Sequence, residues 1–214
     1  MCKINVNISL VVIFILLSYD KDISLTREEL ILKNILAGPR LTLSVPRPED
    51  FDEISDWYTE GNFLRNLDTA PARPLSGEAL EQTYRNLDQN TEYYFHVRSQ
   101  EDDRLIGFVT LYNIDWSNQI SQLAIAIGDP ADRGHGYGTE AINLMLNYGF
   151  NELNLYKVCL DVIATNHAAI AVYQNSGFEF EGTNKLAVKR DGARYDLYSM
   201  GLFASDFQPR IKLD

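Results

Sequence analysis

The segment DPADRGHGYGTEA, residues 129–141, joins a strand-like run to a helix-like run and contains three closely spaced glycines: Gly134, Gly136 and Gly138. Glycine lets the backbone adopt a positive φ and approach a ligand closely. The first turn of a helix also presents unpaired N–H groups and the positive end of the helix dipole. A chain that places glycines at this junction is therefore expected to hold phosphate groups there, within an α/β fold.

Three kinds of phosphate-binding loop differ in the residues around the glycines. A Walker loop requires a lysine after its last glycine, whereas Thr139 follows Gly138 directly here, so an NTPase is not expected. A dinucleotide-binding loop has the spacing G-x-G-x-x-G after an early strand of a parallel sheet. Here the spacing is G-x-G-x-G, and three strand-like runs precede it. A third pattern, R-x-x-G-x-G, is matched by Arg133, Gly136 and Gly138.

A second motif, NHAAIAVYQNSGF, follows at residues 166–178. It matches the pattern N-x-x-A-x-x-x-Y-x-x-x-G-F at Asn166, Ala169, Tyr173, Gly177 and Phe178. With both motifs in this order, the chain resembles the GNAT superfamily of N-acetyltransferases over residues 39–203. Within it, the chain is most similar to the ribosomal-protein-alanine N-acetyltransferase (RimJ/RimL-like) branch, with its related polyamine and antibiotic acetyltransferases.

The resemblance implies the α/β GNAT acyl-CoA N-acyltransferase fold, a mixed six- to seven-stranded sheet flanked by about four helices. The hydrophobic periodicity agrees with this fold, because period-two and helical patterns alternate along the chain. Strand-like runs lie at 40–45, 92–99, 104–114, 121–127, 157–164, 178–190 and 194–203. Helix-like runs lie at 48–60, 76–89, 141–150 and 166–177.

Local signals refine this outline. Ser76 is expected to cap the second helix and Gly177 to end the last one. The pair Asp191-Gly192 predicts a tight hairpin turn. Core positions on the third helix share one face: Ile142, Met145, Leu146 and Gly149.

The resemblance implies that acetyl-CoA is the co-substrate and that the glycine loop binds its pyrophosphate. The implied loop residues are Arg133, Gly134, His135, Gly136, Tyr137, Gly138 and Thr139. Ile125 and Ile127 would offer the edge of a splayed strand to the pantetheine amides, and Asn166 would hydrogen-bond the same arm. No metal is expected.

Tyr173 is the residue for which the resemblance implies a chemical role. Acetyl would pass directly to an amine, without an acyl-enzyme. The departing thiolate has a pKa of about 8.5 by analogy with cysteine, so a phenol with a pKa of about 10 can protonate it. The alternative is that Tyr173 is a packed aromatic side chain on a short helix.

The general base is where the sequence departs from the family. Many relatives carry an acid on the fourth strand, and here that position falls on Gln122 or Leu123, neither of which can accept a proton in this way. A water relay, Asp115 or Glu92 could replace it. Further candidates for the acceptor side are Arg65 and Tyr94, together with Gln122.

The three histidines add little to this picture. His96 shares a strand face with Tyr94, and either lines the acceptor pocket or is structural. We expect His135 and His167 to be exposed.

Charge and composition narrow the choice of partner. Lys and Arg total 19 against 30 Asp and Glu, and a net charge of −11 argues against nucleic acid as a ligand. The predicted function is acetyl transfer to a primary amine, with a protein N-terminus as the first choice. Alternatives are a small amine, such as a polyamine or antibiotic, and a non-catalytic coenzyme A sensor. The loop 61–74 is expected to border the acceptor site, where Arg65 and Arg73 argue against a purely acidic slot. A homodimer is expected by analogy.

Residues 1–38 form an extension before the domain at 39–214. Its apolar run, residues 8–17, is shorter than the roughly 20 residues that span a bilayer. A signal or anchor, a helix packed on the domain, and an untranslated segment before a start at Leu32 all stay open. We expect a cytoplasmic protein without a membrane role. Cys2 and Cys159 form no disulfide framework, and Cys159 is expected in the core.

Overall fold

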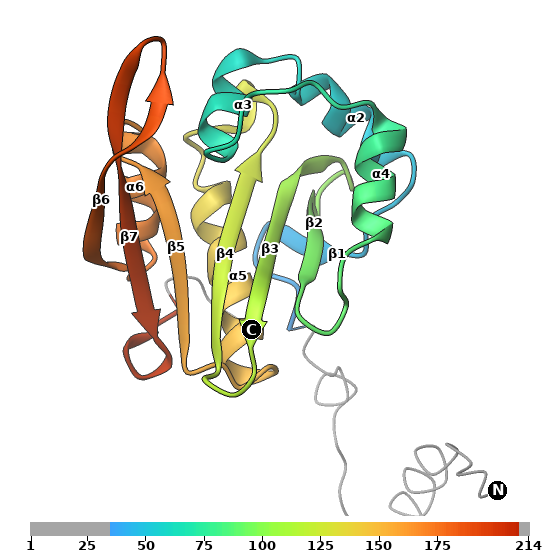
Figure 1. Cartoon of the computed structure of the whole chain (residues 1–214). Coiled ribbons are helices and arrows are strands. Elements are labelled where there is room, and N and C mark those ends of the chain that lie inside the picture. Colours follow the sequence, from blue (N-terminus) through green and yellow to red (C-terminus); the bar gives the residue numbers. More distant parts are fainter. Residues whose placement is uncertain (1–34, 210–214) are drawn as a thin grey trace, which may run out of the picture. The chain divides into compact units, whose positions relative to one another are not determined.

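The computed structural model describes residues 35–209 (Figure 1). The predictions for residues 8–17, Cys2 and Leu32 lie outside this range. Seven strands form one sheet in the order β1-β2-β3-β4-β5-β7-β6. Their bounds are β1 Leu41–Ser44, β2 Tyr93–Ser99, β3 Leu105–Asp115, β4 Ile120–Ile127, β5 Lys157–Ile163, β6 Glu179–Arg190 and β7 Ala193–Phe203. Only the β4–β5 pair is parallel, so the predicted mixed sheet and its antiparallel β2–β3–β4 meander are confirmed.

Five α-helices occur within the described residues, one more than expected. Their bounds are α2 Asp50–Trp57, α3 Gly61–Leu67, α4 Gly77–Arg85, α5 Tyr137–Asn151 and α6 His167–Asn175. The prediction that residues 61–67 belong to a loop is wrong. Phe63 is buried, with its ring 5.7 Å from that of Tyr58. Tertiary packing stabilises this short helix, which its own sequence does not signal.

The two faces of the sheet carry different layers. Alternate strand residues point to opposite faces, so on β3 Val109 and Leu111 pack in the core with α5 and α6, whereas Phe108 packs with α2, α3 and α4. Figure 1 shows α5 behind the sheet, parallel to the central strands. None of the helices in residues 35–209 is long and apolar enough to cross a membrane.

Most local predictions are confirmed. The Ser76 hydroxyl accepts a hydrogen bond from Ala79 N–H at 3.3 Å at the start of α4. Gly177, with φ +99°, follows α6, and Asp191 and Gly192 have φ of 49° and 79° in the β6–β7 turn. The predicted core face of α5 is fully buried.

The prediction that Cys159 lies in the core is wrong. Cys159 is half-buried rather than in the core, because it points to the face of β5 opposite that of Val158 and Leu160. Its neighbour on that face is Lys157, which pairs with Glu181 at 2.6 Å. Burial still raises the pKa of the Cys159 thiol.

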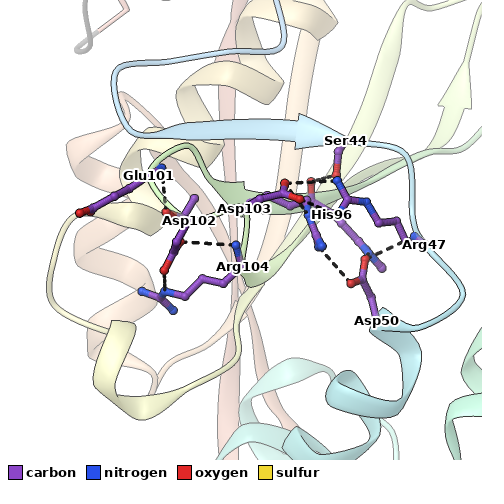
Figure 2. A network of polar contacts seen from close by, with 10 residues as sticks. Ser44, Arg47, Asp50, His96, Glu101, Asp102, Asp103 and Arg104 are labelled. Carbon is purple, nitrogen blue, oxygen red and sulfur yellow. Dashed lines mark hydrogen bonds and ion pairs between the residues drawn. The ribbon is translucent and has the colours of Figure 1, made fainter.

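A buried ion network joins the start of α2 to β2 (Figure 2). His96 is completely buried, and its Nδ1 lies 2.7 Å from Asp50 Oδ2. The other Asp50 oxygen accepts a hydrogen bond from Arg98 Nη1 at 3.0 Å. Among the described residues His96 Nε2 has no partner. Burial lowers the pKa of His96, although Asp50 acts in the opposite direction. His96 therefore anchors the fold and does not line an acceptor pocket.

Candidate active site

The site opens where two neighbouring strands part. β4 and β5 pair only from Ile120–Lys157 to Gln122–Cys159, although both strands continue further. Figure 1 shows the strands diverging beyond that point. The opening is a cavity of about 650 Å³, lined by β4 from Leu123 to Ile127, the glycine loop, α6 and the end of α3. The splay that the resemblance implied is therefore present, and Ile125 and Ile127 line it.

The Arg133 side chain bonds the glycine loop to the end of β4. Its guanidinium donates to the Gly128 carbonyl at 2.6 Å and to the Ile127 carbonyl at 3.2 Å, and it pairs with Glu60 at 2.7 Å. Two of these bonds join Arg133 to carbonyl groups at the end of β4. The Arg133 side chain thus holds the loop in place, and its charge is compensated within the protein.

The glycines set the backbone at the start of α5. Gly134 and Gly136 both have φ +81°, a conformation that strains other residues. Gly136 is the N-cap of α5 and provides no side-chain cap for the first turn. Gly136, Gly138 and Thr139 line the cavity. An uncapped helix start beside positive-φ glycines fits a bound pyrophosphate.

A second support, which the motifs did not reveal, joins the loop to β1. Glu140 is only 2% exposed, and it accepts hydrogen bonds from the Arg40 and Leu41 N–H groups at 2.8 and 2.9 Å. The Arg40 guanidinium pairs with Glu140 at 2.8 Å and donates to the His135 carbonyl at 2.9 Å. It also lies 4.8 Å from the centre of the Tyr137 ring. Arg40 thus balances a carboxylate in the first turn of α5 that would otherwise oppose an anion there.

Tyr173 lies on α6, is 7% exposed and lines the cavity. Burial, with a smaller contribution from Tyr112, raises its pKa to about 12. The phenol is therefore protonated at neutral pH and can donate a proton. Asn166 also lines the cavity, but its side-chain oxygen caps α6 by accepting from Ala169 N–H at 3.2 Å. The side-chain nitrogen of Asn166, Nδ2, is therefore the group that can donate to a ligand.

The other side of the cavity carries acids that sequence reasoning missed. Asp68, Asp161 and Tyr112 line it. Asp161 is exposed, and its Oδ1 accepts from the Ser199 hydroxyl at 2.7 Å. The pKa of Tyr112 is raised by burial and then by Asp161 and Asp68. The available signal was a charged residue alternating into the apolar strand KVCLDV.

The candidates for the acceptor side lie elsewhere. The Arg65 guanidinium forms an ion pair with Asp191, its Nη1 2.7 Å from Oδ2. Tyr94 stacks on Phe108 with ring centres 5.4 Å apart. Gln122 lies at the end of the paired part of β4. None of these three candidates, and neither His135 nor Tyr137, is among the cavity-lining residues.

Asp115 and Glu92, the two alternative general bases, are not among the cavity-lining residues either. Asp115 instead accepts hydrogen bonds from Ser117 and Asn118 in the β3–β4 turn. Glu92 is half-buried just before β2. His135 and His167 are exposed, as expected.

Comparison with known proteins agrees with this geometry. Residues 40–179 match the family model of the acetyltransferase (GNAT) domain. The chain belongs to the GNAT family of N-acetyltransferases. It is 32% identical over 154 residues to the probable N-acetyltransferase YjcK of Bacillus subtilis, covering 72% of this chain and 84% of that protein. It is 28% identical over 174 residues to the prophage-derived N-acetyltransferase YokL of the same organism, covering 80% and 94%.

A solved structure shares the fold over most of this GNAT chain. Spermidine N-acetyltransferase from Vibrio cholerae, in complex with CoA and spermine, superimposes with a TM-score of 0.70 at 28% identity. The match covers 78% of this chain and 96% of that chain. The fold expected from the two motifs is thereby confirmed.

Proposed function

We propose that the protein transfers acetyl from acetyl-CoA to a small cationic amine of the polyamine type. The observation that carries this proposal is the charge of the cavity. Asp68 and Asp161 face it without a basic partner among residues 35–209. Carboxylates without a cation in a site favour a ligand that brings its own positive charge.

The remaining charges of the cavity are balanced within the protein. Asp132 pairs with Arg104 at 2.7 Å, and Arg133 pairs with Glu60. Arg65, which argued against an acidic slot, is held by Asp191. The uncompensated charge therefore belongs to the acceptor side.

On the acceptor side of the cavity, residues 68–70 are bonded to the end of β6, and this connection favours a small acceptor over a peptide. Arg190, at the end of β6, donates to the Asp68 carbonyl at 3.0 Å and to the Ala70 carbonyl at 3.2 Å. Asp68 and Thr69 line one wall, and Leu197 of β7 lines another. A protein N-terminus needs a groove that continues past the reacting amine, whereas an amine the size of spermidine does not. The similarity to a spermidine N-acetyltransferase supports the same choice.

The residues divide the reaction between them. Acetyl-CoA supplies the thioester. The N–H groups from Gly134 to Thr139 would bind its pyrophosphate, and the open edge of β4 at Ile125 and Ile127 would bind the pantetheine amides. A backbone N–H on that edge would stabilise the oxyanion. Tyr173 would protonate the departing thiolate.

Thiol release by the full chain tests this function. The purified protein is incubated with acetyl-CoA and with spermidine, an aminoglycoside, or peptides that begin with Ala or Ser. We expect the highest kcat/KM with spermidine. A preference for the peptides would overturn the substrate class. Coenzyme A binding without thiol release for any amine would instead indicate a non-catalytic sensor.

A further inference from the structure

The place of Asp161 in the sheet is the starting point. The last β4–β5 pair is Gln122–Cys159. Asp161 comes two residues later on β5 and therefore points to the same face as Cys159. At that level β4 has already moved away. The Asp161 side chain lines the cavity at the level where the strands part.

The Asp161 carboxylate is held but not neutralised. Ser199 is its partner on β7, and the Ser199 hydroxyl donates to Oδ1 at 2.7 Å. Within residues 35–209 no bond is formed by the other oxygen, Oδ2, and no cation pairs with the group. One oxygen is oriented and the other is left for a ligand. Because Asp161 is exposed, a proton on it can pass on to water.

The ionisable groups around Asp161 come from three elements. Tyr112 lies on β3, Cys159 on β5 and Asp68 after α3, and Asp161 raises the pKa of both Tyr112 and Cys159. Lys157, also on β5, is occupied by Glu181 at 2.8 Å. Tyr112 in turn acts on Tyr173. Asp161, Tyr112 and Tyr173 line the same cavity, and Tyr112 interacts electrostatically with each of the other two.

We propose that Asp161 is the general base toward the acceptor amine, with Ser199 as its positioning residue. This inference rests on the proposed function. An acid on β5 would supply what Gln122 on β4 cannot. It would also explain why a chain without the usual acid keeps Tyr173 and the glycine loop.

The proton balance can be written in full. The alkylammonium gives one proton to Asp161, and the free amine attacks the thioester carbonyl, forming a C–N bond. The C–S bond then breaks, and the Tyr173 phenol protonates the thiolate. The Tyr173 phenolate takes the second proton from the nitrogen. Asp161 releases its proton to water, so both residues return to their starting state.

The experiment compares two isosteric variants in one cavity, Asp161→Asn and Asp68→Asn, with spermidine as the probe. For Asp161→Asn we expect kcat to fall about 10²- to 10⁴-fold, the range that general-base catalysis supplies. The loss should shrink as the pH rises, because free amine then needs no base. Asp68→Asn should raise the KM for spermidine and keep the wild-type pH profile.

The controls separate the two proposals. Thermal melting and coenzyme A affinity should be unchanged in both variants. Ser199→Ala should lower kcat less than Asp161→Asn does. Wild-type kcat in Asp161→Asn, or a change in KM alone, would overturn the role of Asp161. No thiol release by the wild-type protein with any amine would instead overturn the proposed function.

Discussion

The two halves of the cavity are built in different ways. The proposed coenzyme half is mainly one continuous segment, from the edge of β4 through the glycine loop into α5, and apart from Asn166 on α6 its proposed binding groups are backbone N–H groups. The proposed acceptor half is assembled from separate segments, and its proposed binding groups are the side chains of Asp68, Tyr112 and Asp161. A backbone site needs glycines at fixed spacing, whereas a side-chain site needs only that distant residues meet. The first kind can be recognised from a motif and the second cannot.

The supports of the two halves differ as well. The coenzyme half is held by Arg133 and by the Arg40–Glu140 pair, which act on the loop itself. The acceptor half is bordered by α3, which packs on the sheet together with α2 and α4, and Asp50 of α2 bonds to Arg98 of β2. Five substitutions test these differences, and the one for which we expect the greatest change comes first.

Tyr173→Phe removes the proposed acid where the two halves meet. We expect kcat for thiol release to fall about 10²- to 10⁴-fold, because phenylalanine has no hydroxyl to protonate the thiolate. In the wild-type protein the pKa of about 12 keeps the Tyr173 phenol protonated until that step. Coenzyme A affinity, measured by calorimetry, should stay at its wild-type value. A variant with wild-type kcat would show that Tyr173 is a packing residue only.

Asp50→Ala removes the anchor of α2. We expect the free energy of unfolding to fall by about 3–5 kcal/mol, because buried Arg98 loses its buried partner and keeps only the exposed Asp103 carboxylate at 3.2 Å. Denaturant unfolding measures the change. The matched control is Asp102→Ala, whose carboxylate is 53% exposed and pairs with the exposed Arg104, so about 1 kcal/mol or less is expected. Equal losses in the two variants would argue against the anchor.

Arg40→Ala removes the support of the glycine loop from β1. We expect the KM for acetyl-CoA to rise about tenfold, or roughly 1.4 kcal/mol, with kcat and the amine KM close to wild type. Arg40→Lys should recover only part of this, since lysine lacks the planar fork. Arg85→Ala, which breaks an exposed pair on α4, is the control and should change neither KM.

Arg190→Ala separates the walls of the acceptor half. We expect the KM for spermidine to rise a few-fold while the KM for acetyl-CoA is unchanged, because only residues 68–70 lose their tie to β6. Steady-state kinetics with each substrate varied in turn measures this. A rise in the coenzyme KM of the same size would mean that the two halves are not independent.

His96 makes stability depend on pH. Its pKa is lowered in the folded protein, so below about pH 6.5 the unfolded chain binds more protons than the folded one. The stabilisation is therefore complete above that pH and declines as the pH falls through it. We expect Tm to drop on acidification in the wild-type protein and to drop less in His96→Gln. If Tm falls equally with pH in the two proteins, groups other than His96 cause the decline.

The sequence predicted the elements of the fold well and the acceptor half poorly. Ser76, Gly177 and Asp191-Gly192 act locally, so their roles could be inferred without knowing the fold. Residues 61–67 form a helix because Phe63 finds a buried place, which no local pattern announces. Cys159 was misplaced because an apolar run does not say which of its alternating faces is covered.

Arg133 shows the limit of a motif. Its match helped to identify the family, yet its side chain supports the loop by binding the Gly128 carbonyl and Glu60. A motif fixes which residue stands at a position and leaves open what its side chain contacts.

The strand–loop–helix unit, the Tyr173 helix and the family could all be inferred from the sequence, because positive φ and helix capping are set by neighbours along the chain. Three contacts could be learned only from the folded protein: Asp161 lines the cavity, Arg40 pairs with Glu140 and Arg190 bonds to residues 68–70. These contacts join residues far apart in the chain. They depend on strand register and on where β4 and β5 part, and both are set by the packing of the whole sheet.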